Sequence, residues 1–178
     1  MQYGEFAVAD YLSKRIKDAS VFIPASAQEK GIDLLLYRYN NGCNTTNTIQ
    51  VKMSRTYCGE KDTAAYPYYL WFNRFTIQKN ANWYILVGIY AKRPDDAANA
   101  KAKSTSWDTI MLAFTNKEMA AFMAEVKQKK DPGKDDKMFG FGFDDEKHIF
   151  QTRGYAEQRD MTAYLIENRL DEIRNSFM

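Results

Sequence analysis

The sequence contains a single histidine, His148, among its 178 residues. Zinc sites with several histidine ligands are therefore excluded, and we expect no catalytic triad with a histidine base. Cysteine is scarce as well, and Cys43 and Cys58 do not have the spacing of a metal site. We expect two free thiols in a cytoplasmic protein rather than a disulfide.

Long apolar runs are also missing. No segment approaches the roughly 20 apolar residues of a membrane-spanning helix, and the first residues lack the basic and apolar regions of a signal peptide, so no membrane partner is expected. The composition, 45% hydrophobic and 27% charged, is typical of one globular domain over residues 1–178.

The net charge of +2 is too small to attract nucleic acid to the whole surface. Binding would need a local cluster of basic side chains. Each possible cluster also fits ordinary solvated surface, which is the commoner role of any one of them. The possible clusters are Lys52 with Arg55, Arg74 with Lys79, and the group Lys92, Arg93, Lys101 and Lys103.

The clearest pattern in the chain lies in residues 31–55. Two runs rich in β-branched and aromatic residues flank an Asn/Gly/Thr connector, which predicts a β-hairpin. Side chains two residues apart share one face of a strand, so Gln50 and Lys52 lie on the same face. With the reversal centred near Gly42, we expect Asp33 opposite Lys52 on that face.

This hairpin gathers a carboxylate, an amide oxygen and an amine at its open end. Magnesium takes oxygen ligands, few of them from the protein, and keeps several waters. Asp33, the Gln50 side-chain oxygen and the Val51 carbonyl are its expected ligands, with Lys52 beside a water on the ion. Such an ion lowers the pKa of the water and neutralises a phosphate under attack, as phosphodiester hydrolysis requires.

A helix is predicted before the hairpin, from about residue 2 to residue 17. Its apolar residues recur at helical spacing, and Glu5 lies on the same stripe. Glu5 is either a first-turn residue favoured by the helix dipole or a group that points into the metal site. The apolar residues of the stripe are Val8, Ala9, Leu12 and Ile16.

Gly31-Ile32-Asp33, followed after the connector by Gln50-Val51-Lys52, resembles the core motif of the PD-(D/E)xK nuclease superfamily in its Gln-x-Lys variant. That family places an acidic residue at the start of one strand and an (Asp/Glu/Gln)-x-Lys triplet on the next. Many members add a glutamate from the first helix, a position that Glu5 matches. No proline precedes Asp33 directly, and Gln50 stands where an acid is usual. The motifs cover the first third of the chain.

The resemblance implies a magnesium-dependent DNA endonuclease of restriction or repair type, with manganese as a substitute metal. Cleaving both strands of double-stranded DNA usually takes two active sites, so we expect a homodimer. The expected catalytic residues are Glu5, Asp33, Gln50 and Lys52, and the residues expected to contact DNA are Arg55, Lys92 and Arg93.

Two other functions fit the same sequence. Because Gln50 leaves the metal site one charge short, the chain could be a catalytically inactive nuclease-fold domain that binds nucleic acid or a protein partner. A third candidate is an interaction module that uses the aromatic residues of 66–77, and it would need Asp33 and Lys52 to diverge in space. Aromatic residues at this density can stack on unpaired bases, but they more often cover a core, which is the role predicted here.

The rest of the chain predicts alternating strands and helices. Residues 83–91 are almost wholly apolar and predict a central strand buried on both faces. Thr115 and Glu118 form a capping box that begins a helix. This order favours an α/β fold with a mixed central β-sheet flanked by helices, which the restriction-endonuclease-like resemblance implies as well. Strands or edge segments are predicted at 21–24, 66–77, 107–114 and 138–143, loops at 56–65 and 92–106, and helices at 116–129 and 155–177.

Overall fold

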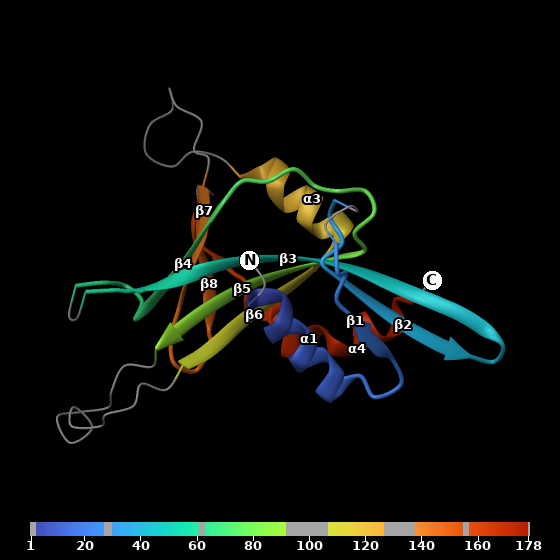
Figure 1. Cartoon of the computed structure of the whole chain (residues 1–178). Coiled ribbons are helices and arrows are strands. Elements are labelled where there is room, and N and C mark those ends of the chain that lie inside the picture. Colours follow the sequence, from blue (N-terminus) through green and yellow to red (C-terminus); the bar gives the residue numbers. More distant parts are fainter. Residues whose placement is uncertain are drawn as a thin grey trace, which may run out of the picture.

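A single long strand, β3 (Cys43–Cys58), belongs to two β-sheets and joins them (Figure 1). Its residues up to Arg55 pair within the first sheet, sheet A, and its last three residues pair within the second, sheet B. The computed structural model describes residues 3–26, 30–60, 63–91, 107–126, 138–154 and 157–177.

Sheet A is mixed. β3 and β5 run parallel, while the other neighbouring strands of the sheet are antiparallel. Successive side chains of β5 enter different cores, because Tyr84 and Leu86 face one side of the sheet and Ile85 and Val87 face the other. The prediction of a central strand buried on both faces is confirmed. The strands of sheet A are, in spatial order, β1 (Ser20–Phe22), β2 (Leu34–Asn40), β3, β5 (Trp83–Ala91) and β6 (Trp107–Thr115).

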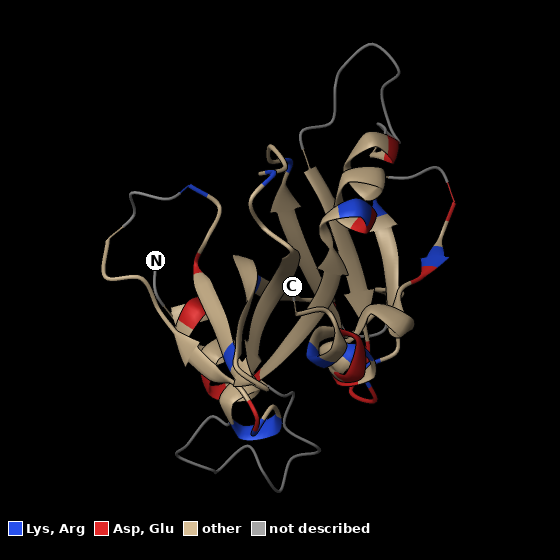
Figure 2. Cartoon of the chain, turned by 90° about the vertical axis from the view of Figure 1, so that its right-hand side faces the viewer, with Lys and Arg blue, Asp and Glu red and all other residues tan. Residues whose placement is uncertain are grey.

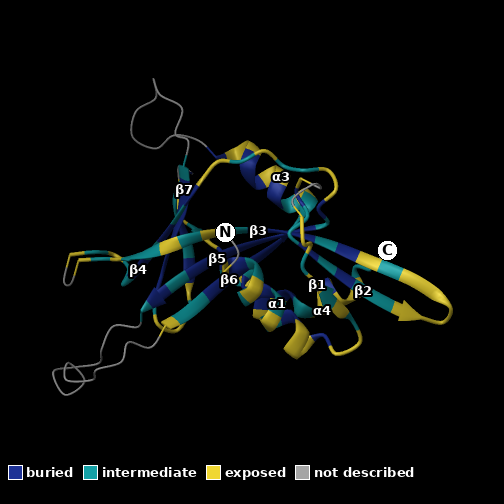
Figure 3. Cartoon of the chain, viewed as in Figure 1, coloured by how far each residue is buried: buried dark blue, intermediate teal, exposed yellow. Residues whose placement is uncertain are grey.

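Sheet B is antiparallel and packs over one face of sheet A. The core between the sheets contains residues of both, including Tyr84 and Leu86 of β5 and Phe139 and Phe141 of β7 (Figure 3). The sequence predicted a central sheet flanked by helices, and it did not predict that a second sheet covers part of this face. Beside the end of β3, sheet B contains β4 (Tyr68–Asn73), β7 (Met138–Phe143), β8 (Ile149–Arg153) and β9 (Arg159–Asp160).

Two helices, α1 (Tyr3–Arg15) and α4 (Ile166–Asn175), cover the opposite face of sheet A. The third, α3 (Asn116–Glu125), adds Met119, Phe122 and Met123 to the core between the sheets (Figure 1). The capping box that begins α3 is confirmed, since the Thr115 side chain accepts from the Glu118 N–H and the Glu118 carboxylate accepts from the Thr115 N–H. The structure is thus a mixed α/β fold dominated by antiparallel pairing.

Other predicted boundaries need correction. Residues 56–58, predicted as loop, still belong to β3, because they pair with β4. The helix predicted at 155–177 begins only at Ile166, after β9 and a 3-10 turn at Thr162–Tyr164. The predicted connector 92–106 and the end of the helix predicted at 116–129 lie outside the described residues. Among the helices in the described part of the chain, none is long and apolar enough to cross a membrane.

Candidate active site

The predicted hairpin is present, but its register differs from the prediction. β2 and β3 pair with Asn40 opposite Cys43, and the two turn residues, Asn41 and Gly42, have φ values of 50° and 78°. Such a turn suits residues that tolerate positive φ. The predicted register would place Leu34 opposite Val51, whereas Leu34 lies opposite Ile49, two positions away.

A shift of two residues does not change the face on which a side chain lies, because side chains alternate with a period of two. Gln50 and Lys52 lie on the face of sheet A toward sheet B, since their neighbours Ile49 and Val51 pack on the other face. Asp33 comes directly before the first residue of β2. Burial raises the pKa of the Tyr84 hydroxyl, and the negative charge of Asp33 raises this pKa further, so Asp33 lies near Tyr84.

Asp33 is fixed by two hydrogen bonds to β3. Its backbone N–H donates to the Ile49 carbonyl at 2.9 Å, and its carboxylate Oδ2 accepts from the Val51 N–H at 2.7 Å. The carboxylate thus occupies a position along β3 where the pairing with β2 has ended. Because a carboxylate has about four lone-pair sites, the bond to Val51 does not exhaust its capacity as a ligand.

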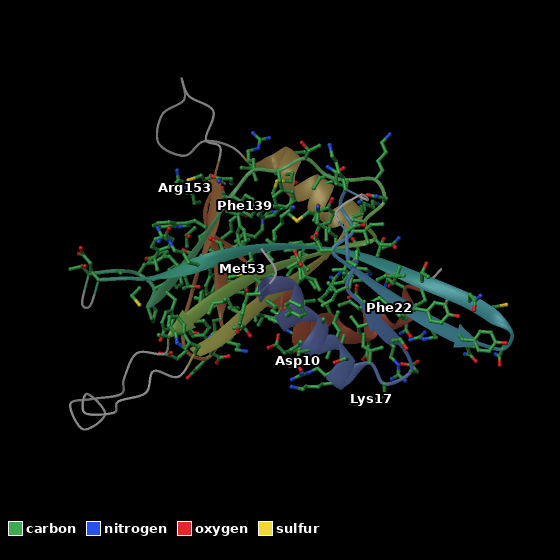
Figure 4. The ribbon with its side chains drawn as sticks, in the orientation of Figure 1. Asp10, Lys17, Phe22, Met53, Phe139 and Arg153 are labelled. Atoms are coloured by element: carbon green, nitrogen blue, oxygen red, sulfur yellow. The ribbon has the colours of Figure 1, made fainter. Side chains whose placement is uncertain are left out.

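A cleft of about 390 Å³ lies beside β3, next to the residue that precedes β2. Glu5 reaches it from α1, because the first turn of that helix packs closely on β3. A Cβ on Gly4 would lie 2.9 Å from the Cβ of Met53, which is labelled in Figure 4. We call this space the Asp33 cleft, and its lining residues are Glu5, Asp33 and residues 51–55.

Lys52 is half-buried where the Asp33 cleft meets a second groove. Its Nζ lies 5.5 Å from the centre of the Phe75 ring, and Phe75 stacks on Tyr84 with 5.7 Å between the ring centres. An ammonium over an aromatic face is attracted by the negative ring surface. This contact places the Lys52 amine beside Phe75, which lines the second groove.

Gln50 is only 6% exposed, and its Oε1 is buried without a hydrogen-bond partner in the described structure. An unsatisfied buried acceptor is unusual and costly, and a cation would satisfy it. Gln50 does not itself line the Asp33 cleft, although its neighbours Val51 and Lys52 do.

The oxygen donors at this position fit magnesium by type. They are the carboxylates of Asp33 and Glu5, the amide oxygen of Gln50 and the carbonyl of Val51, and magnesium needs few protein ligands. Within the described ranges, no three His, Cys, Asp or Glu side chains group as a metal site. A site here would therefore depend on the neutral oxygens of Gln50 and Val51 as well as on acids.

Of the three residues expected to contact DNA, the structure describes only Arg55. Arg55 lines the Asp33 cleft, and its Nε donates to the Tyr57 hydroxyl at 2.8 Å. Lys92 and Arg93 lie outside the described residues. Basic residues in the described part of the chain are spread over several elements and mixed with acidic ones (Figure 2). Any cationic surface at this site is therefore local.

Sequence reasoning missed the second groove, of about 290 Å³. We call it the Trp71 groove, and residues 52–54 and 71–75 line it. It forms where β3 leaves β4 to enter sheet A, since the pairing of the two strands ends at Thr56 and Leu70. The alternation in residues 68–72 was the available signal, because it places Tyr68, Leu70 and Phe72 inside and Trp71 outside.

Comparison with family models, with curated proteins and with solved structures gives no match.

Proposed function

We propose that this protein is a magnesium-dependent endonuclease that hydrolyses phosphodiester bonds in DNA. One observation carries the proposal: Glu5, Asp33 and Lys52, which come from α1, the start of β2 and β3, line a single cleft. These are the positions that the nuclease motif assigns to catalysis. We further propose that α1, the β2–β3 hairpin and the parallel strand β5 form a restriction-endonuclease-like core.

Each residue has a distinct role in this proposal. Asp33 and Glu5 supply negative charge to hold the cation, and the Gln50 and Val51 oxygens complete the protein's share of ligands. Magnesium, when bound, neutralises charge on the phosphate and makes a water easier to deprotonate. Lys52 donates hydrogen bonds to the attacking oxygen or to the phosphate as its charge grows. Manganese suits the same oxygen donors.

A non-catalytic domain is the second candidate, and the bond from Val51 N–H to Asp33 favours it. That bond gives Asp33 a structural role, and Gln50 brings no charge. Such a domain would keep the fold and bind nucleic acid or a protein partner. The interaction-module hypothesis required Asp33 and Lys52 to diverge, whereas both line the Asp33 cleft.

Incubation with DNA tests the proposal. The purified chain should convert supercoiled plasmid or labelled oligonucleotides to shorter products in magnesium or manganese, and EDTA should stop the reaction. Absence of cleavage in both metals, on double-stranded and single-stranded DNA, would favour the non-catalytic domain.

Gln50→Glu is expected to tighten magnesium binding by about tenfold or more, because it adds a negative charge to the ligand set. Isothermal titration calorimetry measures this affinity directly. Gln151→Glu is a matched control, since Gln151 is 2% exposed and its Oε1 is also buried without a partner, but it lies in β8. Equal magnesium affinity in Gln50→Glu and the parent protein would remove Gln50 from the ligands.

We propose a homodimer on double-stranded DNA, because cutting both strands usually takes two active sites. Light scattering with a duplex oligonucleotide should therefore give a protein mass of twice 20.7 kDa. A monomer with and without DNA would argue against cleavage of both strands. Cleavage of a single strand would then remain the proposed activity.

A further inference from the structure

Five aromatic side chains lie together on the side of sheet B that faces away from the core. We call this set the aromatic face, and each of its residues is half-buried, so each ring keeps exposed surface. Its ring centres follow one another at 4.8 Å for Tyr57 and Trp71, 6.1 Å for Trp71 and Tyr69, 6.0 Å for Tyr69 and Tyr66, and 5.6 Å for Tyr66 and Phe150.

Glycines support these rings from below. A Cβ on Gly140 would lie 2.2 Å from Trp71 Cδ1, and a Cβ on Gly142 would lie 2.4 Å from Tyr66 Cδ2. The rings thus occupy the space that side chains of β7 would otherwise fill. Backbone contact on one side fixes the rings before any ligand binds, which lowers the entropy cost of binding.

The aromatic face is continuous with the Asp33 cleft. Trp71 lines the Trp71 groove, which shares Lys52, Met53 and Ser54 with the cleft. Arg55 lines the cleft, and its guanidinium lies 4.9 Å from the centre of the Tyr57 ring. Arg74 also lines the groove, and its Nη2 donates to the Met123 carbonyl at 3.3 Å. The junction therefore places positive charge beside exposed rings.

This combination matches the chemistry of an unpaired nucleic-acid strand. Its phosphates are attracted by guanidiniums such as that of Arg55, and its bases have open faces that stack on aromatic side chains. The bases of a duplex are already stacked and paired, so they cannot use these rings without opening. The Arg55 guanidinium beside the Tyr57 ring suits a partner that carries negative charge next to flat rings, which a nucleic-acid strand does at every nucleotide.

We propose that the aromatic face binds an unpaired stretch of nucleic acid, with bases on the Trp71, Tyr57 and Tyr69 rings, and leads that strand into the Asp33 cleft. The role in cleavage rests on the proposed nuclease function, but the binding does not. The preferred substrate would then be a single strand, or a duplex with an unpaired tail, and the strand cut would be the unpaired one. Such cleavage needs one active site, so it does not require the homodimer proposed for cutting both strands of a duplex.

Fluorescence anisotropy in EDTA tests binding without any cleavage. The probes are fluorescein-labelled dT12, rU12 and a 12-base-pair DNA duplex. At least one single strand should bind at least about tenfold more tightly than the duplex, and Trp71→Ala should weaken its binding by about tenfold or more, the scale of one lost stacking contact. Trp107→Ala is the matched control, because Trp107 is 67% exposed and lies outside the aromatic face. The ratio of dT12 to rU12 affinity separates DNA from RNA.

A second measurement does not depend on the Ala variant folding. In Trp107→Phe the remaining tryptophans are Trp71 and Trp83, and Trp83 is 2% exposed with its Nε1 donating to Ser176. Adding dT12 or rU12 should therefore quench the emission of Trp71. Duplex binding as tight as single-strand binding, unchanged affinity in folded Trp71→Ala, or no quenching would each overturn the inference. If the parent protein binds the single strand but cleaves no DNA in magnesium or manganese, the nuclease function is contradicted and the binding inference stands.

Discussion

Asp33→Asn is expected to lower magnesium-dependent cleavage by about a thousandfold, the upper end of the effect of a single lost electrostatic contact in an active site. In the parent protein the Val51 N–H donates to the Asp33 carboxylate at 2.7 Å. Asparagine keeps an oxygen that can accept this hydrogen bond. It removes the negative charge that the proposed site needs to hold magnesium. The substitution therefore separates the structural role of Asp33 from its catalytic one. Cleavage rates and magnesium titrations measure the effect.

Two companion variants make the comparison decisive. Asp33→Ala should lose cleavage and also some stability, by about 1–3 kcal/mol, since it leaves the Val51 N–H without its acceptor. Asp10→Asn removes an exposed aspartate of α1, which pairs with Lys14, and should cleave like the parent protein. If Asp33→Asn cleaves at the parent rate while Asp33→Ala unfolds more easily, Asp33 is only a structural residue.

Lys52→Ala is expected to lower cleavage by at least about a hundredfold while DNA affinity changes little. The ammonium is proposed to act on charge that develops during the reaction, so its loss raises the barrier more than it weakens the bound state. Single-turnover cleavage rates and anisotropy in EDTA measure the two effects separately. The expected signature is a lower rate constant at nearly constant dissociation constant.

Two further lysine variants control for packing and for net charge. Lys52→Met keeps an apolar stem that can contact Phe75, so it should show the same loss of rate as Lys52→Ala if the charge is what matters. Lys79→Ala removes one positive charge from an exposed residue that lines neither the Asp33 cleft nor the Trp71 groove. Parent-like cleavage in Lys52→Ala would leave the motif as a strand with polar residues on one face.

The sequence was informative where a local rule decides the structure. The Asn/Gly/Thr connector and the strand-type residues on both sides of it were sufficient to predict the β2–β3 hairpin, and the period of two in strands placed Gln50 and Lys52 on one face. The prediction missed the register by two positions, because the connector does not show which of its residues form the turn. Capping chemistry similarly located the start of α3.

The pairing of the strands in sheet B could not be predicted, because it depends on contacts between segments that are far apart in the sequence.

The C-terminal helix was predicted too long. The apolar spacing after residue 160 indicated one long amphipathic helix, but its apolar residues belong to different cores. Met161 and Leu165 pack between the sheets, whereas Ile166 and Ile173 pack under α1. A periodic apolar stripe predicts a single helix only when all its residues pack against the same core. Similarly, Trp71 has a role in a groove only because β3 and β4 separate beside it.

The position of β3 in both sheets has a consequence for how the chain folds. β2 and β5 complete sheet A only by pairing with β3, and β4 attaches to its far end. The parallel contact between β3 and β5 must wait until the intervening chain has been synthesised and closed into a loop, a slow kind of contact to form. Disruption of β3 would therefore remove pairing from both sheets, together with the Asp33 cleft that it lines.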